Sequence, residues 1–491
     1  MPDSELEPRH LRKTMTWRDG FAIALVIPTG LFVTFGFLIG AIGVWTAIAI
    51  WVGATFVALL QNVLFAEMAS MFPGKSGGVA RYAIEGWKRY FAPIGAIASF
   101  GYWMGWSLSI SVVASTFGSL IQAQWFPRAS ASVHFLGHDL GLAHLIGVVA
   151  IGAAWLVNYF GIRIGAVVNK VIGAFMIVGL AIVAIGPLVR GGWHPSNLTW
   201  TVNGGWLTVV VMFYITAWVT YGSEICASFA PEYRDTIRDT AKALRRTSVF
   251  MLGLFFIVPF GVGGSIGEKA IAADPAGYVA AAFQQVLGGA SWIGVVLVVA
   301  SLFLSMVSTT ADGGRALYGL AQEGMTVKQL DWVNRWGVPG RSLTIDAVLN
   351  IAVLVLLGSP VSILLASNFG YLTAITLAVA AFLLLRKDRP NWPRPIRCGR
   401  LWLPVAGVIV LLNVFVLAIG VSHPGLAGYG SFTDTAIGLG ILLLSVLLFI
   451  YRRVVQDRER IQWRIPAPSA PDEDEAVLLA EEAAAVPAAK A

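Results

Sequence analysis

The sequence predicts an all-α polytopic membrane protein with twelve transmembrane helices, arranged as two inverted units of five helices plus two further helices. Of its 491 residues, 57% are hydrophobic and 12% are charged, whereas soluble domains carry about 25% charged residues. Apolar runs of about 20 residues, long enough to cross a bilayer as helices, recur along the chain. Lysine and arginine gather in alternate loops between these runs.

The apolar runs predict the spans in chain order, at residues 20–44, 46–72, 91–124, 141–160, 165–189, 205–230, 246–266, 286–319, 342–358, 362–385, 402–421 and 436–453. No small-residue cleavage site ends the first run, so we expect it to stay as a span rather than act as a signal peptide. The spans predict an N-terminal tail, a first five-helix unit, an inverted second unit, two added helices and a disordered acidic tail, at residues 1–19, 20–189, 205–385, 402–453 and 456–491.

The positions of the basic residues predict the orientation. If the N-terminus is cytoplasmic, all but three of the 34 Lys and Arg residues fall on the cytoplasmic side, the exceptions being Arg128, Arg190 and Lys269. Such asymmetry follows the positive-inside rule. We therefore expect a multi-pass protein of the cell membrane, surrounded by lipid, with both termini in the cytoplasm.

Charge placement and motif spacing argue against other classes of protein. The net charge of +7 lies in loops, which predicts no nucleic-acid partner. The stretch PGKSGG (73–78) resembles the end of a phosphate-binding loop, but Ala69 stands where that motif needs glycine. Five of the six histidines lie in or beside predicted external loops, without metal-site spacing. The sequence thus predicts no enzyme, no catalytic residues, no metal and no cofactor.

Two helix breaks indicate a binding site. Pro28-Thr29-Gly30 interrupts the first span, where proline removes a backbone donor and glycine tolerates unusual dihedral angles. Thr220-Tyr221-Gly222-Ser223 interrupts the sixth span. These spans are five apart, so two five-span units would have opposite orientations, and paired breaks in inverted halves indicate a transporter's binding site. A simple proline kink is the alternative for the first break.

The breaks also suggest a ligand. We expect the second half of span 1 to start near Leu31 and to direct free NH groups at the break, which suits a carboxylate. The first half of span 6 ends near Thr220 with free carbonyls, which suit an ammonium. Opposed helix ends of this kind favour an α-amino acid or a related amine as the small-molecule substrate.

Three stretches resemble signatures of the amino acid–polyamine–organocation (APC) superfamily of permeases. FAEMASMFPGKSGGVARYAIEGW (65–87) resembles the signature that runs from the end of span 2 into the following loop, with Glu67 before Pro73 and Ser76-Gly77-Gly78. The span 6 signature is resembled by WVTYGSEICASFAPEYRDT (218–236), and span 8 with its loop by STTADGGRALYGLAQEGM (308–325) and VNRWGVPGRS (333–342). The resemblance covers about residues 15–455 and implies the inverted five-plus-five fold with two added helices.

The resemblance also implies substrate contacts, because PTGLF (28–32) occupies the place of the family's Gly-Ser/Ala-Gly-Ile-Phe. Main-chain contacts are implied at Thr29, Gly30, Val219 and Thr220. The predicted substrate-binding set is Pro28, Thr29, Gly30, Trp218, Val219, Thr220, Tyr221 and Gly222. Trp218 and Glu224 match an aromatic gate and an acidic residue of the arginine/agmatine-exchanger branch. Two residues depart from the family pattern: Pro28 replaces its first glycine, and Met176 stands where proton-coupled members often have lysine.

Glu224 needs an explanation, because a carboxylate inside a membrane is costly. It could be structural, bonded to freed backbone NH groups; it could pair with a cationic substrate; or it could be a protonatable gate residue. We favour the gate with proton coupling, because Met176 replaces the usual lysine. Sodium is the less favoured coupling ion, with Ser305, Ser308 and Thr309 as candidate ligands, since such hydroxyls usually bond their own backbone.

Other side chains complete the prediction. The candidates to line the cavity are Trp103 and Trp106 in span 3, Ser305 and Tyr371, although aromatic residues in membrane helices more often pack or anchor at the interface. Glu67 is expected to be a structural partner for basic loop residues. The whole pattern predicts a secondary transporter that works by alternating access. The alternatives are a cationic amine, polyamine or nucleobase substrate, and a transporter-like nutrient sensor that binds without transport.

Overall fold

The computed structural model describes residues 13, 15–73, 77–135, 138–160, 166–202, 204–275, 277–427, 431–466, 468, 470–471, 476–477 and 479–480. Within these residues, eleven helices are long and apolar enough to cross a membrane, and a bent pair raises the number to twelve if it is one span. The only described strands form one hairpin, β1 (Ser132–Phe135) and β2 (His138–Gly141). The predicted all-α membrane fold is confirmed.

Each predicted span corresponds to one helix or to two consecutive helices. The α-helices are α1 (Trp17–Ala24), α2 (Thr29–Ile42), α3 (Val44–Met71), α4 (Gly78–Phe91), α5 (Ile94–Ser107), α6 (Ser109–Trp125), α7 (Leu142–Tyr159), α8 (Ala166–Arg190), α9 (Trp206–Thr220), α10 (Thr236–Ile266), α11 (Glu268–Ala273), α12 (Tyr278–Leu287), α13 (Ser291–Gln322), α14 (Gly340–Leu357), α15 (Pro360–Asp388), α16 (Trp402–Ser422) and α17 (Phe432–Tyr451). The short elements are η1 (Pro195–Asn197), η2 (Tyr221–Glu232), η3 (Gly288–Ala290), η4 (Lys328–Leu330), η5 (Pro424–Ala427) and η6 (Arg452–Gln456).

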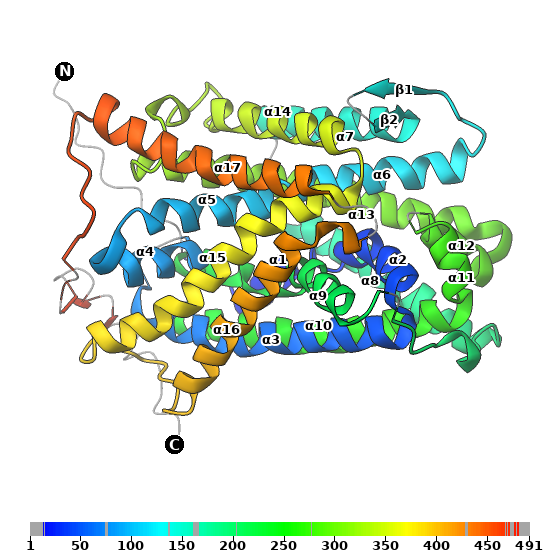
Figure 1. Ribbon diagram of the computed structural model, residues 1–491, viewed down its shortest axis with the longest axis horizontal. Coiled ribbons are helices and arrows are strands. Elements are labelled where there is room, and N and C mark those ends of the chain that lie inside the picture. The colour runs from blue at the N-terminus through cyan, green and yellow to red at the C-terminus, as the bar shows by residue number, and fades with distance from the viewer. Residues whose placement is uncertain are drawn as a thin grey trace.

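The packing puts the broken helices at the centre. α3 lies along α10 at one edge, α7 and α14 lie together at the opposite edge, and α15 packs between α4, α5 and the outer pair α16 and α17 (Figure 1). α2 is buried on nearly every side, as expected for a helix that is apolar all round. In contrast, Val408, Leu411 and Leu447 on α16 and α17 are more than half exposed, which fits a surface covered by lipid.

The first break is a bend of 40° between α1 and α2. Its backbone is tightened rather than opened, because the NH groups of Thr29, Gly30 and Leu31 donate to the carbonyls of Val26, Ile27 and Pro28 at 3.2, 3.0 and 3.0 Å. The position of the break was predicted correctly. The prediction of free NH groups is wrong, because these groups donate hydrogen bonds, and the second half of span 1 begins at Thr29 rather than near Leu31. Three-residue turns satisfy the donors that an α-helical bend would have left without partners.

The second break begins where it was predicted. α9 ends at Thr220, and the next 12 residues, Tyr221–Glu232, continue as a 3₁₀-helix. Runs of 3₁₀-helix longer than three or four residues are uncommon, and inside a longer helix they often mark a hinge or strain. The two breaks touch: a Cβ added at Gly30 would lie 2.5 Å from Cγ1 of Val219, so only glycine permits this approach.

Glu67 is held by the last turn of α15 and by the loop between α15 and α16, as predicted for a structural carboxylate. Its oxygens accept hydrogen bonds from Arg386 Nε and Nη2, both at 2.6 Å, and from the Cys398 NH at 2.7 Å. Arg394 Nε lies 3.1 Å away in a second ion pair. In this loop, burial lowers the pKa of Arg394 and raises the pKa of the Cys398 thiol to about 12.

The chain after α17 crosses the same end of the bundle, and we call residues 452–465 the C-terminal strap. Asp457 pairs with Lys328 Nζ at 2.9 Å. Further along, Trp463 stacks on Phe91 with ring centroids 5.6 Å apart, and the Ala92 NH donates to the Trp463 carbonyl at 2.8 Å. This part of the predicted mobile tail is therefore bound to the bundle, while residues 481–491 lie outside the described residues.

Candidate functional site

A cavity of about 50 Å³ lies where the two breaks meet. Its walls come from α2 and the turn before it, the α5–α6 junction, α9 with the start of η2, α13 and α15. Nine of the candidate residues line this cavity: Thr29, Gly30, Trp106, Trp218, Val219, Gly222, Ser305, Thr309 and Tyr371. The inverted-break argument therefore led to the central cavity of the molecule.

Trp218 is held in place at the cavity wall. Its indole Nε1 donates to the Ser367 hydroxyl at 3.1 Å and lies 3.3 Å from the Gly105 carbonyl. Its neighbour Val219 packs against Gly30 from the opposite break. α9 stays α-helical up to Thr220, where the 3₁₀-helix η2 begins. The side chains of Trp218 and Val219 therefore lie at the end of a regular helix.

Five predicted side chains are absent from the described cavity wall. They are Pro28, Trp103, Thr220, Tyr221 and Glu224. The Thr220 hydroxyl donates to the Thr216 carbonyl at 3.1 Å, and the Tyr221 hydroxyl donates to Asn413 Oδ1 on α16 at 3.0 Å. Trp103 Nε1 donates to the Gly313 carbonyl at 3.2 Å. The bonds of Tyr221 and Trp103 tie η2 to α16 and α5 to α13, whereas the bond of Thr220 stays within α9. All three polar groups are thus used inside the protein in this conformation.

Glu224 lies one side chain behind the cavity wall. It is fully buried, and Oε1 accepts hydrogen bonds from the Tyr371 hydroxyl at 2.8 Å and from Trp106 Nε1 at 3.3 Å. Both rings line the cavity. Its other oxygen, Oε2, is buried without a hydrogen-bond partner among the described residues. A buried carboxylate with one oxygen unmatched is poorly stabilised as an anion in an apolar interior.

Further cavity residues lie outside the predicted set: Val26, Ile27, Val33, Gly105, Ser109 and Val113. Trp106 lies three residues from Trp103, on the same helix but with a different environment. Span 3 is divided at Leu108, between α5 and α6. Which of the two tryptophans faces the cavity depends on how α5 packs against α13 and α15, and aromatic spacing alone gives no signal for it.

Of the three candidates for a sodium site, Ser305 and Thr309 line the cavity, and Ser308 is absent from its described wall. The Thr309 hydroxyl donates to the Ser305 carbonyl one turn earlier. This is the backbone bonding that Ser and Thr commonly make in membrane helices. Within the described residues, no group of three or more His, Cys, Asp and Glu side chains could hold a metal ion.

Comparisons with known proteins agree with this arrangement. The family model described as "Amino acid permease" matches residues 17–449. The chain is 27% identical to the amino-acid permease RocE of Bacillus subtilis over 347 residues, covering 68% of this chain and 71% of RocE. It is 24% identical to the histidine permease HisP of Lactococcus lactis (88% and 92% covered) and 26% identical to the aromatic amino acid transport protein AroP of Salmonella typhimurium (87% and 93% covered). These relatives support amino acid transport across a membrane, and the chain belongs to the amino acid permease family of the APC superfamily.

Proposed function

We propose that this protein is a secondary transporter that moves a neutral α-amino acid across the cell membrane by alternating access. The central cavity at the meeting point of the two breaks carries this proposal. Among the described residues, none of those lining it is Lys, Arg, Asp or Glu. A zwitterion has no net charge, so such a wall accepts it without leaving a buried charge unpaired. The relatives named for histidine and for aromatic amino acids support an amino acid rather than a nucleobase.

The main-chain groups at the breaks are the proposed contacts for the substrate. A carbonyl oxygen has two lone pairs, so the Ile27 carbonyl can accept from an ammonium while it keeps its turn bond. The Val26 carbonyl already accepts from both the NH and the hydroxyl of Thr29. The NH groups of Thr29 and Gly30 are already used, and they reach a carboxylate only if these turns open. A cavity of about 50 Å³ is also much smaller than the roughly 150 Å³ that holds a benzene molecule. Substrate binding thus requires the first break to open.

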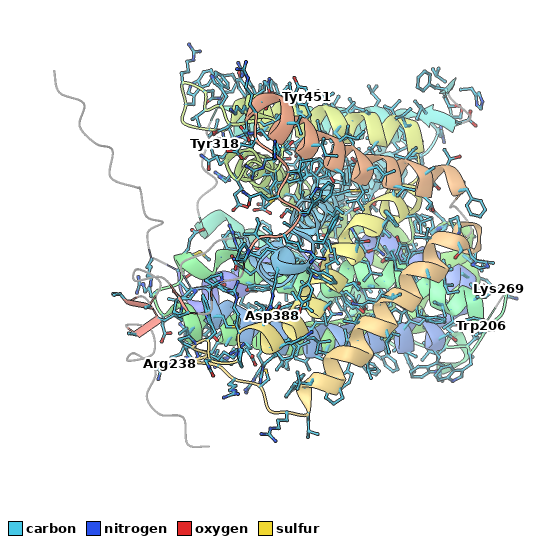
Figure 2. The ribbon with its side chains drawn as sticks, turned by 60° about the vertical axis from the view of Figure 1, so that its left-hand side comes forward. Trp206, Arg238, Lys269, Tyr318, Asp388 and Tyr451 are labelled. Atoms are coloured by element: carbon cyan, nitrogen blue, oxygen red, sulfur yellow. The ribbon has the colours of Figure 1, made fainter. Side chains whose placement is uncertain are left out.

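The two ends of the bundle fit the proposed topology. Trp206 and Lys269, both expected outside, lie at one end, and Arg238 and Asp388, both expected inside, lie at the other (Figure 2). This separation, together with the positive-inside rule, supports the proposal that both termini are cytoplasmic.

Replacing Gly30 with Leu tests the substrate site. The new side chain would overlap Val219 and fill the break, so we expect loss of amino acid exchange in proteoliposomes. Gly53→Leu on α3 is the control, because a Cβ there meets no atom within 4 Å. Normal exchange in a well-folded Gly30→Leu protein would contradict the proposed site. Ligand binding without exchange in the wild-type protein would favour a sensor.

A further inference from the structure

A second cavity, of about 250 Å³, opens where α7 ends and α14 begins. It is lined by Tyr159, Gln329, Leu330, Trp332, Gly340, Arg341, Thr344 and Ile345, none of which lines the central cavity. α7 and α14 run side by side along one edge of the bundle (Figure 1). The substrate pathway proposed above does not use this cavity.

The loop that forms one wall is held by the buried side chain of Asn334. Asn334 Nδ2 donates to the Tyr159 carbonyl at the end of α7 at 2.9 Å. Its Oδ1 accepts from the NH groups of Trp336 and Val338 at 3.0 and 3.2 Å. Because one amide fixes both the loop and its contact with α7, the cavity is already formed without a ligand.

Arg341 lines this cavity, and Arg335 lies in the loop that Asn334 holds beside it. Arg341 lies 5.0 Å from the ring centroid of Trp332, and Arg335 lies 4.1 Å from that of Trp336. The ion pairs between described residues include neither arginine. Arg341 Nη1 donates to the Gln329 carbonyl at 3.3 Å, which fixes the side chain further. Stacking on tryptophan orients a guanidinium while its other NH groups remain available to an anion. We call Arg341 and the neighbouring Arg335 the basic rim of the cavity.

The rim continues into an apolar face. Ile345 and Val348 follow Arg341 by four and seven residues on α14, so they lie on the same side of the helix. They are 50% and 60% exposed. Since α14 is a membrane span, this face meets lipid. A ligand that uses the whole surface must have an anionic head and a hydrocarbon tail.

We propose that this cavity binds the head group of an anionic phospholipid, with the phosphate at Arg335 and Arg341 and an acyl chain along Ile345 and Val348. Arginine suits phosphate because its planar NH groups match two phosphate oxygens at once. Basic pockets between transmembrane helices bind anionic head groups, and Trp and Tyr concentrate at the level of the head groups. Tyr159 and Trp332 in the cavity wall occupy that level.

Native mass spectrometry of the delipidated full-length protein tests this proposal. Phosphatidylglycerol should bind more tightly than phosphatidylcholine. Each basic side chain near a membrane surface contributes enough that Arg341→Gln should weaken phosphatidylglycerol binding by about fivefold. The double variant Arg335→Gln, Arg341→Gln should bind the two lipids alike. Arg400→Gln, an exposed arginine before α16, is the control and should bind like the wild type.

Two outcomes would overturn the proposal. One is a double variant that elutes as a single species and still prefers phosphatidylglycerol. The other is displacement of the bound lipid by soluble glycerol phosphate, which lacks acyl chains and would show a site for free anions. A wild-type preference that the double variant loses and that glycerol phosphate leaves unchanged would establish the lipid site.

Discussion

Glu67 and Glu224 are both buried carboxylates, yet their surroundings differ. Glu67 is paired with Arg386 and Arg394 and also accepts a backbone NH. Glu224 accepts bonds from two neutral aromatic side chains, and its second oxygen has no partner among the described residues. A carboxylate without a cation, placed directly behind the cavity wall, is suited to take up and release a proton as that wall moves.

Glu224→Gln should flatten the pH dependence of transport while amino acid exchange survives. The glutamine oxygen can still accept hydrogen bonds from Tyr371 and Trp106, so the cavity wall should keep its shape. Glutamine does not titrate, so residue 224 can no longer take up or release a proton. Uptake and exchange measured over about pH 5 to 8 would check this. A variant with the wild-type pH profile would make Glu224 a structural residue.

The matched control is Glu232→Gln, at the far end of the same 3₁₀-helix. Burial raises the pKa of Glu232 above its ordinary value, so this group could also titrate during transport. Asp457 cannot contribute, because the hydrogen bond from Lys328 lowers its pKa. A depressed pKa stabilises the fold above the unfolded-state value, and that stability is lost only as the pH falls through the folded-state value. The strap's ion pair therefore persists throughout the assay.

Glu67→Gln should lower the thermal stability of the protein. Removing one partner of a buried ion pair costs about 3–5 kcal/mol, because the other charge stays buried. Here two arginines would be left, and Arg394 is only 3% exposed. Glu323→Gln, which breaks the more exposed pair with Arg81, is the comparison and should lower the unfolding midpoint much less. Equal shifts in the two variants would contradict this role for Glu67.

At the scale of the elements, the attachment of the C-terminal strap to the bundle can be tested directly. Trp463→Ala removes the stack on Phe91, so the hydrogen bond of the Ala92 NH to the strap should open more often. Hydrogen exchange of residues 88–92 and 463–465 should become faster, with little change in the spans. Trp206→Ala removes a comparable stack on Phe415 at the other end of the bundle and should leave these amides unchanged. Unchanged exchange in Trp463→Ala would mean that the strap does not depend on this ring.

The break positions could be predicted because proline and glycine carry their own backbone signals. Pro28 and Gly30 indicated the first break, and the end of α9 at Thr220 matched the second. The use of the freed NH groups could not be predicted, because three-residue turns and open turns have the same sequence preferences. The choice of Trp106 over Trp103 depends on how α5 packs against α13 and α15, which no local pattern records.

For the whole molecule, cysteine labelling would test the proposed topology. Both native cysteines, Cys226 and Cys398, are buried, so the background should be low. An impermeant maleimide added outside intact cells should label Lys269→Cys and leave Lys242→Cys unlabelled until the membrane is opened. Both positions are exposed, so access to the reagent rather than burial decides the result. Labelling of Lys242→Cys from outside would reverse or break the model of twelve spans.

The 3₁₀-helix η2 is longer than an α-helix of the same residues would be. Its 12 residues extend about 24 Å as a 3₁₀-helix but would extend only about 18 Å as an α-helix. The far end is tied to the chain just before α1, because the Met15 NH donates to the Glu232 carbonyl at 3.0 Å and the Arg234 NH donates to the Met15 carbonyl at 2.8 Å. If η2 converted to an α-helix, it would shorten by about 6 Å and would draw the start of α1 toward the central cavity by about that distance. The start of α1 and the end of η2 would therefore move together, and the two broken helices would change conformation in a coupled way.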